Sequence, residues 1–517
     1  MRIFLLTTFA LTLILSLGSA LEPIQEYGVG PRQIIHLLIN FLPVTLTFVL
    51  PLSALFAATL VYGRLAGENE LDACKASGIS PIAIIYPGFV LAVIVAMANL
   101  LLSFHVMPFF IQRAETSLKA DAKQILFRNI QRRGFYRLPG DKYAVYADDA
   151  NPKIDTLFGV IVIKTGDRQI ETIDAAEQAE VSFQSHDQTN EISIMAHNIS
   201  EIGNNVFRSV KLLQVQGQFG PMLGDQIDFK RIHDMKQIQA DPMSFYPTEE
   251  YVRQAAKQLT VELLLQDIQG TLQTGGFYEL LSTGSDPNAI RIKADQCRLS
   301  KSQELQFTQN IEVRIFNRAS GKIIKRLNCE KATLTLEDGD EFYPTAAIEL
   351  RNARTANSTS IIMYDIVRNL ALPLPIYRTI ARDNIMESLD IERLPSLLQR
   401  APTGALKSMT DHLKVHIRWV TAKIIGTIHS RLVFGIGCIP MIAIGIGIGI
   451  LKRGGHLLTA FGVSCIPAVL LIIGIICGKH VTENPLATPA LGLTIMWSGL
   501  GALWLISFIV LSRLYRH

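Results

Sequence analysis

The segment GRLAGENELDACKASGISP, residues 63–81, carries a cluster of charged residues between two long apolar stretches. Glu68–Ser77 is predicted to form a short helix, because acidic residues in its first turns suit the positive end of the helix dipole. Gly78 is placed to end this helix. Ser80 and Pro81 have the residue types that cap and open the next one. The segment therefore predicts a short rigid helix joining two longer helices at one membrane surface.

Six apolar stretches are long enough to cross a membrane, since a helix of about 20 apolar residues spans the hydrocarbon core. They are Ile3–Leu21, Ile34–Tyr62, Pro81–Met107, Leu432–Leu451, Leu457–Cys477 and Ala487–Leu511. In lipid these stretches must be helical to satisfy their backbone groups. The sequence predicts an α-helical membrane protein of six transmembrane helices, in two groups of three, with a large inserted domain.

The first stretch, Ile3–Leu21, has a second interpretation. A short basic start, an apolar run and Gly18-Ser19-Ala20 are also typical of a cleaved secretory signal. The next apolar run follows closely, which favours a retained helix. Retention is our prediction, with cleavage as the alternative.

The orientation of the spans follows from the Lys and Arg residues in their short loops. One side of the membrane would hold Arg2, Arg64, Lys75, Lys452, Arg453, Arg513 and Arg516. The other side would hold only Arg32 and Lys479. This excess predicts that both termini are cytoplasmic and that the inserted domain lies outside, in the periplasm if the cell has two membranes.

The inserted region, from about Thr116 to Ser430, changes to short alternating apolar and polar runs with turn residues between them. Strands are predicted at Tyr143–Tyr146, Phe158–Ile163, Glu191–Met195, Val206–Val215, Ile311–Ile315 and Ala332–Leu336. Regularly spaced turns favour an antiparallel sandwich or a jelly roll. A helix from Pro247 to about Gln266 divides the strands into two portions.

These features together give five predicted parts of the chain. They are residues 1–115 with three spans and the short helix at 68–77, residues 116–245 with a jelly-roll-like domain, residues 246–375 with a helix and a second β portion, residues 376–430 with a helical return segment, and residues 431–517 with three spans.

Several other classes of site find little support. The net charge of +4, without a basic run carrying aromatic residues, gives no reason to expect nucleic acid as a partner. No Cys-x-x-Cys pair occurs, so no metal or cofactor is expected. Cys297 and Cys329 would be either a disulfide in an oxidising compartment or two buried thiols. Gly445 and Gly449 predict close helix packing rather than a nucleotide loop.

The residues around the short helix carry a family resemblance. Leu50-Pro51-Leu52, Gly63-Arg64-Leu65, Glu68-Asn69-Glu70 and Ala76-Ser77-Gly78-Ile79-Ser80 resemble the lipopolysaccharide-export permeases of the LptF/LptG family. His429-Ser430-Arg431 and Lys452-Arg453-Gly454-Gly455 are similar to the pattern of that family as well. The resemblance covers the first 120 and the last 90 residues or so, whereas the middle is similar only in being rich in strands.

The resemblance implies a transporter subunit of the cell inner membrane without catalysis of its own. Such permeases pair with a second LptF/LptG-type permease on a cytoplasmic ABC ATPase dimer. Lipopolysaccharide or a related lipid would enter between the spans and pass to periplasmic jelly-roll bridge proteins. The residues implied to couple to the ATPase are Glu68, Glu70, Cys74 and Ser77.

Two departures from the family and two other interpretations stay open. The external domain is about double the expected size, with a β portion near residues 275–375, and little chain precedes the first span. Composition alone favours the interpretation of this short acidic segment as a solvated connector. The chain as a whole could also be a membrane-anchored β-domain scaffold without transport activity.

Overall fold

A computed structural model describes most of the chain. The described residues are 9, 12, 31–137, 143–166, 169–185, 190–203, 206–219, 227–282, 288–300, 303–317, 322–337, 343–355, 361–451 and 457–516. The chain divides into unit 1, which contains Met1–Tyr246 and Arg418–His517, and unit 2, Pro247–Ile417. The predicted span Ile3–Leu21, apart from Phe9 and Thr12, and the basic loop Lys452–Gly455 lie outside the described residues.

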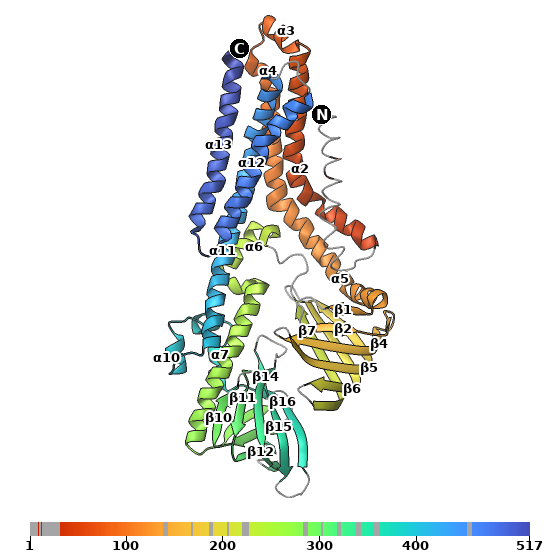
Figure 1. Ribbon diagram of the computed structural model, residues 1–517, viewed down its shortest axis with the longest axis vertical. Coiled ribbons are helices and arrows are strands. Elements are labelled where there is room, and N and C mark those ends of the chain that lie inside the picture. The colour runs from red at the N-terminus through yellow and green to blue at the C-terminus, as the bar shows by residue number, and fades with distance from the viewer. Residues whose placement is uncertain are drawn as a thin grey trace. The chain divides into compact units, whose positions relative to one another are not determined.

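Long apolar helices dominate unit 1 (Figure 1). Its helices are α2 (Pro31–Gly67), α3 (Glu70–Ala76), α4 (Pro81–Leu101), the π-helix η1 (Leu102–Val106), α5 (Met107–Arg133), the later part of α11 (Gly404–Leu451), α12 (Leu457–Glu483) and α13 (Pro489–Arg516). Within the described residues, 5 segments are long and apolar enough to cross a membrane. These segments are Leu38–Gly67, Pro81–Thr116, Gly404–Leu451, Gly462–Glu483 and Pro489–Arg513.

Two glycines of α11 allow close packing against α2. A Cβ atom added at Gly445 would lie 2.7 Å from Leu55 Cδ1, and one added at Gly449 would lie 2.8 Å from the carbonyl oxygen of Thr59. Both positions therefore exclude any side chain, because the backbone and side chains of α2 fill the space. The prediction that Gly445 and Gly449 serve helix packing is confirmed.

A proline in α2 leaves a carbonyl group that α4 satisfies. Pro51 has no N–H, so it cannot bond the carbonyl of Thr47 one turn earlier. Asn99 of α4, fully buried, donates its side-chain N–H to that carbonyl at 2.5 Å. A proline inside a membrane helix is tolerated where a neighbouring helix satisfies the freed group in this way. The bond ties the middle of α2 to the end of α4.

A second bond between α2 and α4 involves Tyr62 near the end of α2. Its hydroxyl donates to the carbonyl of Ile84 at 3.0 Å and accepts from the N–H of Gly88 at 3.2 Å. The hydroxyl thus inserts into the hydrogen-bond ladder of α4 beside Pro87, where one N–H is already missing. A Cβ at Gly88 would lie 2.9 Å from the Tyr62 hydroxyl, so glycine makes room for this contact.

The helix that follows α4 widens into one π turn before α5. The N–H of Met107 bonds the carbonyl of Leu102, which gives the five-residue spacing of a π-helix. Pro108 explains the widening, because its ring would clash with the carbonyl of Phe104 in an ordinary α-turn and it offers no N–H. The helix then continues through α5 to Arg133 and leads directly into the first sheet.

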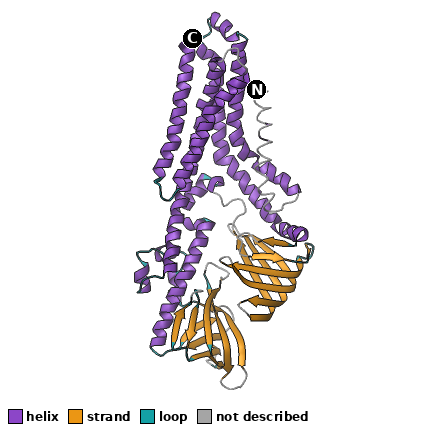
Figure 2. Ribbon diagram, viewed as in Figure 1, coloured by secondary structure: helices purple, strands orange, loops and turns teal. Residues whose placement is uncertain are grey.

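Unit 1 also contains an antiparallel sheet of 7 strands (Figure 2). Its strands are β1 (Phe135–Arg137), β2 (Tyr143–Tyr146), β3 (Asp149–Asn151), β4 (Thr156–Gly166), β5 (Gln169–Ser185), β6 (Asn190–Gly203) and β7 (Val206–Phe219). The order is β1-β2-β4-β5-β6-β7, and β3 pairs with β4. The four strands predicted in this part are confirmed, whereas the sequential order alone does not establish a jelly roll.

Inward-facing residues of this sheet share one apolar core with α5. Leu126, Phe127 and Ile130 of α5 pack in the same cluster as Val145 and Leu157 of the strands. Because α5 is continuous with the end of the second described span, this core fixes the sheet to the membrane helix that leads into it.

Unit 2 contains a second antiparallel sheet of 9 strands. They are β8 (Tyr278–Ser282), β9 (Asn288–Lys293), β10 (Gln296–Leu299), β11 (Leu305–Thr308), β12 (Ile311–Asn317), β13 (Ile323–Cys329), β14 (Lys331–Glu337), β15 (Thr345–Thr355) and β16 (Ile361–Ala371). Since β16 pairs with both β8 and β15, the strands β15-β13-β12-β9-β8-β16 form a closed ring. The predicted strands at Ile311–Ile315 and Ala332–Leu336 are confirmed.

Helix α7 (Tyr246–Gln273) packs along the second sheet and is longer than predicted. Gln269 donates to the carbonyl of Cys297 at 3.0 Å, and Tyr278 donates to Asp267 at 2.8 Å. Cys297 and Cys329 are not joined in a disulfide, and burial raises the pKa of the Cys297 thiol to about 12. Of the two interpretations left open for these cysteines, the structure has the buried thiols.

The return segment of unit 2 contains three short helices before α11 begins. They are α8 (Leu374–Thr379), α9 (Ile385–Ser388) and α10 (Leu394–Leu398). Glu262 of α7, fully buried, accepts hydrogen bonds from the backbone N–H and hydroxyl of Thr403 and lies 3.5 Å from Arg400. A carboxylate at this helix start satisfies free N–H groups and suits the helix dipole.

The Asn99 bond yields a first prediction. Asn99→Leu should lower the free energy of unfolding by about 1–2 kcal/mol, because the carbonyl of Thr47 loses its donor inside the protein. Thermal unfolding of the purified protein in detergent measures the change. Leu101→Ala, at an exposed position of the same helix, is a control that should change stability much less; equal stability of Asn99→Leu and wild type would contradict the assigned role.

Candidate functional site

Helix α3 lies at the end of the span bundle, between the end of α2 and the start of α4 (Figure 1). The N–H groups of Gly78 and Ile79 bond the carbonyls of Lys75 and Cys74 at 3.0 and 3.1 Å. This pair of bonds is a Schellman motif, and Gly78 supplies the positive φ of 83° that the motif requires. The predicted stop at Gly78 is confirmed.

The start of α4 follows the prediction as well. The Ser80 side chain accepts a hydrogen bond from the N–H of Ala83 at 3.3 Å, and Pro81 occupies the first helical position. The connection between α3 and α4 is only residues 77–80, and the Schellman motif and this cap order it. A displacement of α3 must therefore reach the first turn of α4 directly.

One apolar residue fixes α3 to the bundle. Leu71 is 5% exposed and packs in a cluster with Tyr62, Ala66 and Ile85 of the flanking helices. A second stripe, to one side of Leu71, holds Glu70, Cys74 and the capping residue Ser77, which recur at helical spacing. Glu70 and Ser77 are exposed, and Cys74 is half-buried. The short helix therefore presents a polar face away from the bundle while its apolar side holds it in place.

The structure corrects the extent of the predicted helix. Its first residue is Glu70, whereas Glu68 and Asn69 form the turn after α2, with Asn69 at a positive φ of 57°. The Glu68 carboxylate lies 3.5 Å from the Arg64 guanidinium, one turn earlier, and both side chains are exposed. Glu68 thus has an intramolecular partner and lies off the stripe of Glu70, Cys74 and Ser77.

This site offers contacts rather than chemistry. Among the described residues, no group of three His, Cys, Asp or Glu side chains is arranged to hold a metal ion. Helix α3 carries a negative first turn with Glu70 and Asp72. What it can do is bind a complementary surface and transmit its displacement to α2 and α4.

A second polar site occupies the opposite end of the span bundle, and it was not predicted in the sequence analysis. Asp228 in the short helix η2 (Ile227–Phe229) accepts hydrogen bonds from Lys479 of α12 at 2.5 Å and from Thr427 of α11 at 2.7 Å. One carboxylate thus joins two spans to the segment that follows the first sheet. We name Asp228, Thr427, Arg431 and Lys479 the junction cluster.

Arg431 adds backbone contacts to the junction cluster. Its side chain is 7% exposed and donates to the carbonyl of Asp228 at 2.6 Å and to that of Lys230 at 3.3 Å. The guanidinium also lies 5.7 Å from the ring centre of Phe104, inside the π turn. A buried arginine that satisfies carbonyls at the end of a short helix holds that segment in one conformation.

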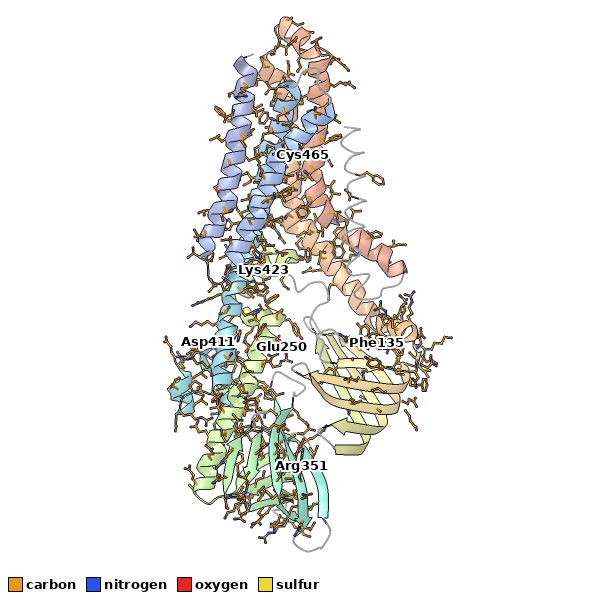
Figure 3. All side chains as sticks on the ribbon, viewed as in Figure 1. Phe135, Glu250, Arg351, Asp411, Lys423 and Cys465 are labelled. Carbon is orange, nitrogen blue, oxygen red and sulfur yellow. The ribbon has the colours of Figure 1, made fainter. Side chains whose placement is uncertain are left out.

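An apolar core lies beside the junction cluster. Ile227 of η2 and Met235 of α6 (Ile232–Ala240) pack with Val420 and Ile424 of α11. Phe245, which follows the 3₁₀-helix η3 (Pro242–Ser244), belongs to the same cluster. Figure 3 labels Lys423 on α11 beside α6, one turn before Thr427.

The positive charges around Asp228 stabilise its ionised carboxylate. Burial alone would raise the pKa of Asp228, yet the Lys479 charge, hydrogen bonds from Lys479 and Thr427, and the Lys423 charge lower it below 3.8. Lys479 also lies 3.9 Å from Glu483, one turn later on α12. Asp228 is therefore ionised throughout the physiological range.

No sequence pattern linked these residues, because Asp228 and Lys479 are 251 positions apart. One signal was present: Arg431 and Lys479 are cations at the ends of otherwise apolar stretches. A charged residue at the end of a membrane span either pairs with an opposite charge or lies at the membrane–water interface. Arg431 and Lys479 could therefore have been named as candidate site residues, but their partner Asp228 could not.

The junction cluster yields a second prediction. Asp228→Asn should lower the free energy of unfolding by about 1–3 kcal/mol, since the partly buried Lys479 loses its counter-ion. The folded-state pKa of Asp228 is depressed, so its contribution is present above pH 3.8 and is lost as the pH falls below that value.

The control is a double-mutant cycle with Lys479→Gln, measured by chemical unfolding in detergent. The double variant should be less destabilised than the sum of the single variants by about 1 kcal/mol. Strict additivity would show that the two side chains do not interact.

Comparison with known proteins supplies one match. Residues 1–259 match the model of the family described as lipopolysaccharide export system permease LptF/LptG. Curated individual proteins give no match. The matched range includes the first sheet and the junction residue Asp228, which the resemblance by motif did not cover. It ends before the second sheet and before the last three spans.

The family match agrees with the long apolar helices and with the strand-rich region between them. It covers the turn and helix at residues 68–77, although it assigns no role to single residues there. The chain belongs to the LptF/LptG family of lipopolysaccharide export permeases and is a membrane-embedded transport protein.

Proposed function

We propose that the chain is one permease subunit of an exporter that moves lipopolysaccharide, or a closely related lipid, out of the inner membrane. A separate cytoplasmic ABC-type ATPase dimer would drive it, with α3 as the coupling helix. A second permease of the same family would complete the membrane part, and periplasmic β-domain bridge proteins would receive the lipid. The span predicted at Ile3–Leu21 would complete a set of six helices.

The observation that carries the proposal is the attachment of α3. Two residues separate the helix from the end of α2, and a connection of four residues, ordered by the Schellman motif, separates it from the start of α4. Tyr62 joins α2 to α4 within one turn of this site. A force on the exposed stripe of Glu70, Cys74 and Ser77 would therefore move both spans as a rigid body.

The acidic start of α3 indicates the character of its partner. Glu70 lies in the first turn and is exposed, whereas its neighbour Leu71 is buried against the bundle. An arginine or lysine on a partner could form a charge-assisted hydrogen bond there. Glu68, already paired with Arg64, would contribute less.

The orientation of the protein follows from the same proposal. With α3 on the cytoplasmic side, the positive-inside pattern places both termini in the cytoplasm. The junction cluster would then lie at the outer face of the membrane, and both sheets would lie in the periplasm. Motion of α11 and α12 would reach the first sheet through Asp228.

A charge reversal tests the coupling role and gives the third prediction. Glu70→Arg should reduce co-purification of the ATPase with this permease by roughly tenfold, because like charges would then face each other at the contact. Pull-down from membranes, followed by the ATPase activity of the recovered complex, measures the loss.

Glu392→Arg is the matched control, since it reverses an exposed carboxylate in unit 2. It should leave association unchanged. If the protein were a scaffold without transport activity, wild type and both variants would recover the same amount of ATPase, which could be zero. That outcome would overturn the coupling role of α3.

A further inference from the structure

The outer face of the second sheet carries a row of three arginines. Arg291 of β9 lies opposite Arg314 of β12, which lies opposite Arg326 of β13. Residues directly opposite on antiparallel strands point to the same face. The three guanidinium groups thus follow one line across three neighbouring strands. Like charges at such spacing repel, so the row needs a stabilising feature.

Two carboxylates supply part of that stabilisation. Glu312, one pair along from the row, contacts Nε of Arg314 at 2.7 Å and Nε of Arg326 at 2.6 Å. Glu279 of β8 contacts Nε of Arg291 at 2.9 Å. All three contacts are made by Nε, the guanidinium nitrogen nearest the aliphatic part of the side chain. None of these three contacts involves the two terminal Nη atoms.

Aromatic rings hold the same side chains in position. The Arg291 guanidinium lies 4.4 Å from the ring centre of Phe316, and that of Arg314 lies 4.3 Å from the ring centre of Phe277. Stacking on a ring face orients a planar guanidinium and reduces its conformational freedom before any ligand binds. Phe316 is 7% exposed, so the support beneath Arg291 is a fixed part of the domain.

A second row of residue pairs, two positions along the strands from the first, adds two more cations. Lys293 lies opposite Glu312, which lies opposite Asn328, which in turn lies opposite Arg354 of β15. These two rows of described residues therefore hold five cations and two carboxylates. An ordinary solvated face alternates charges, and its flexible side chains are not stacked on rings. The excess of oriented positive charge indicates a surface suited to an anion.

We infer that this face, the arginine row Arg291, Arg314 and Arg326 with its neighbours Lys293 and Arg354, binds the phosphate groups of the exported lipopolysaccharide. The inference rests on the proposed function. The planar guanidinium of arginine presents a fork of N–H donors that can bind two oxygens of one phosphate, whereas the ammonium of lysine cannot. Neighbouring strands place the arginines about 5 Å apart along the row, so a phosphorylated glycan could bridge more than one of them.

The position of the domain in the chain supports a role beyond the shared family function. The family match ends at residue 259, and every strand of the second sheet follows it. The ring of strands encloses its own apolar core, including Leu280, Ile292 and Val313, so its interior is filled by side chains. The outer face is therefore the part of this sheet that can meet a large polar ligand.

The test uses the full-length protein in detergent and two probes. One probe is rough-type lipopolysaccharide with its phosphates intact, and the other is the same material after chemical removal of phosphate. The variant carries Arg291→Gln, Arg314→Gln and Arg326→Gln together. It should bind the phosphorylated probe roughly tenfold more weakly than wild type does, a difference of about 1.4 kcal/mol.

Removal of phosphate from the probe should reduce binding by wild type and leave little further effect of the triple variant. The difference between wild type and variant should also shrink at high salt, since the charges are partly exposed and screened. The control variant carries Arg298→Gln, Lys331→Gln and Arg393→Gln, three exposed cations elsewhere in unit 2. It should bind both probes as wild type does, with an unchanged unfolding temperature.

Two results would overturn the inference: wild-type affinity of the triple variant for the phosphorylated probe, or an equal loss of affinity for both probes. Binding is measured without an ATPase. Failure of Glu70→Arg to affect the ATPase would therefore count against the proposed coupling alone, and failure here would count against phosphate recognition alone.

Discussion

The structure depends on one constraint: in lipid, every backbone group that a proline frees must find a partner inside the protein. Pro51 frees the carbonyl of Thr47, and Asn99 satisfies it from α4. Beside Pro87, the Tyr62 hydroxyl enters the ladder of α4 from α2. Pro51 thus explains the bond from Asn99 of α4 to α2, and the Tyr62 hydroxyl adds a second connection between the two helices beside Pro87.

Because α2 and α4 are joined in this way, a displacement of the short helix α3 would be transmitted to both of them. A helix of 7 residues has little stability in isolation, so its caps and Leu71 hold it to the ends of α2 and α4. At the far end of the bundle, Asp228 joins α11 and α12 to the segment that leads out of the first sheet. The membrane part therefore has a fixed polar attachment at each end, one suited to an external force and one suited to pass motion on.

Local rules predicted the caps and the strands well. Gly78, Ser80 and Pro81 act through bonds to residues a few positions away, so their roles can be derived from residue type and order. The junction cluster could not be derived, because the pairing of Asp228 with Lys479 depends on how helices far apart in the chain are packed. The start of α3 shows a smaller failure. An acidic residue such as Glu68 suits the first turn of a helix, but the positive φ of Asn69 makes a turn there and the helix begins only at Glu70.

The most direct test of the mechanical claim is Tyr62→Phe in the purified permease complex with its ATPase. The change removes only the hydroxyl that joins α2 to α4, so α3 would keep its exposed stripe. Measured as lipopolysaccharide transferred per ATP hydrolysed, coupling should fall several-fold while ATP hydrolysis and complex assembly persist. An unchanged ratio in an assembled complex would contradict the account, because α3 would then act without the bond proposed to transmit its motion.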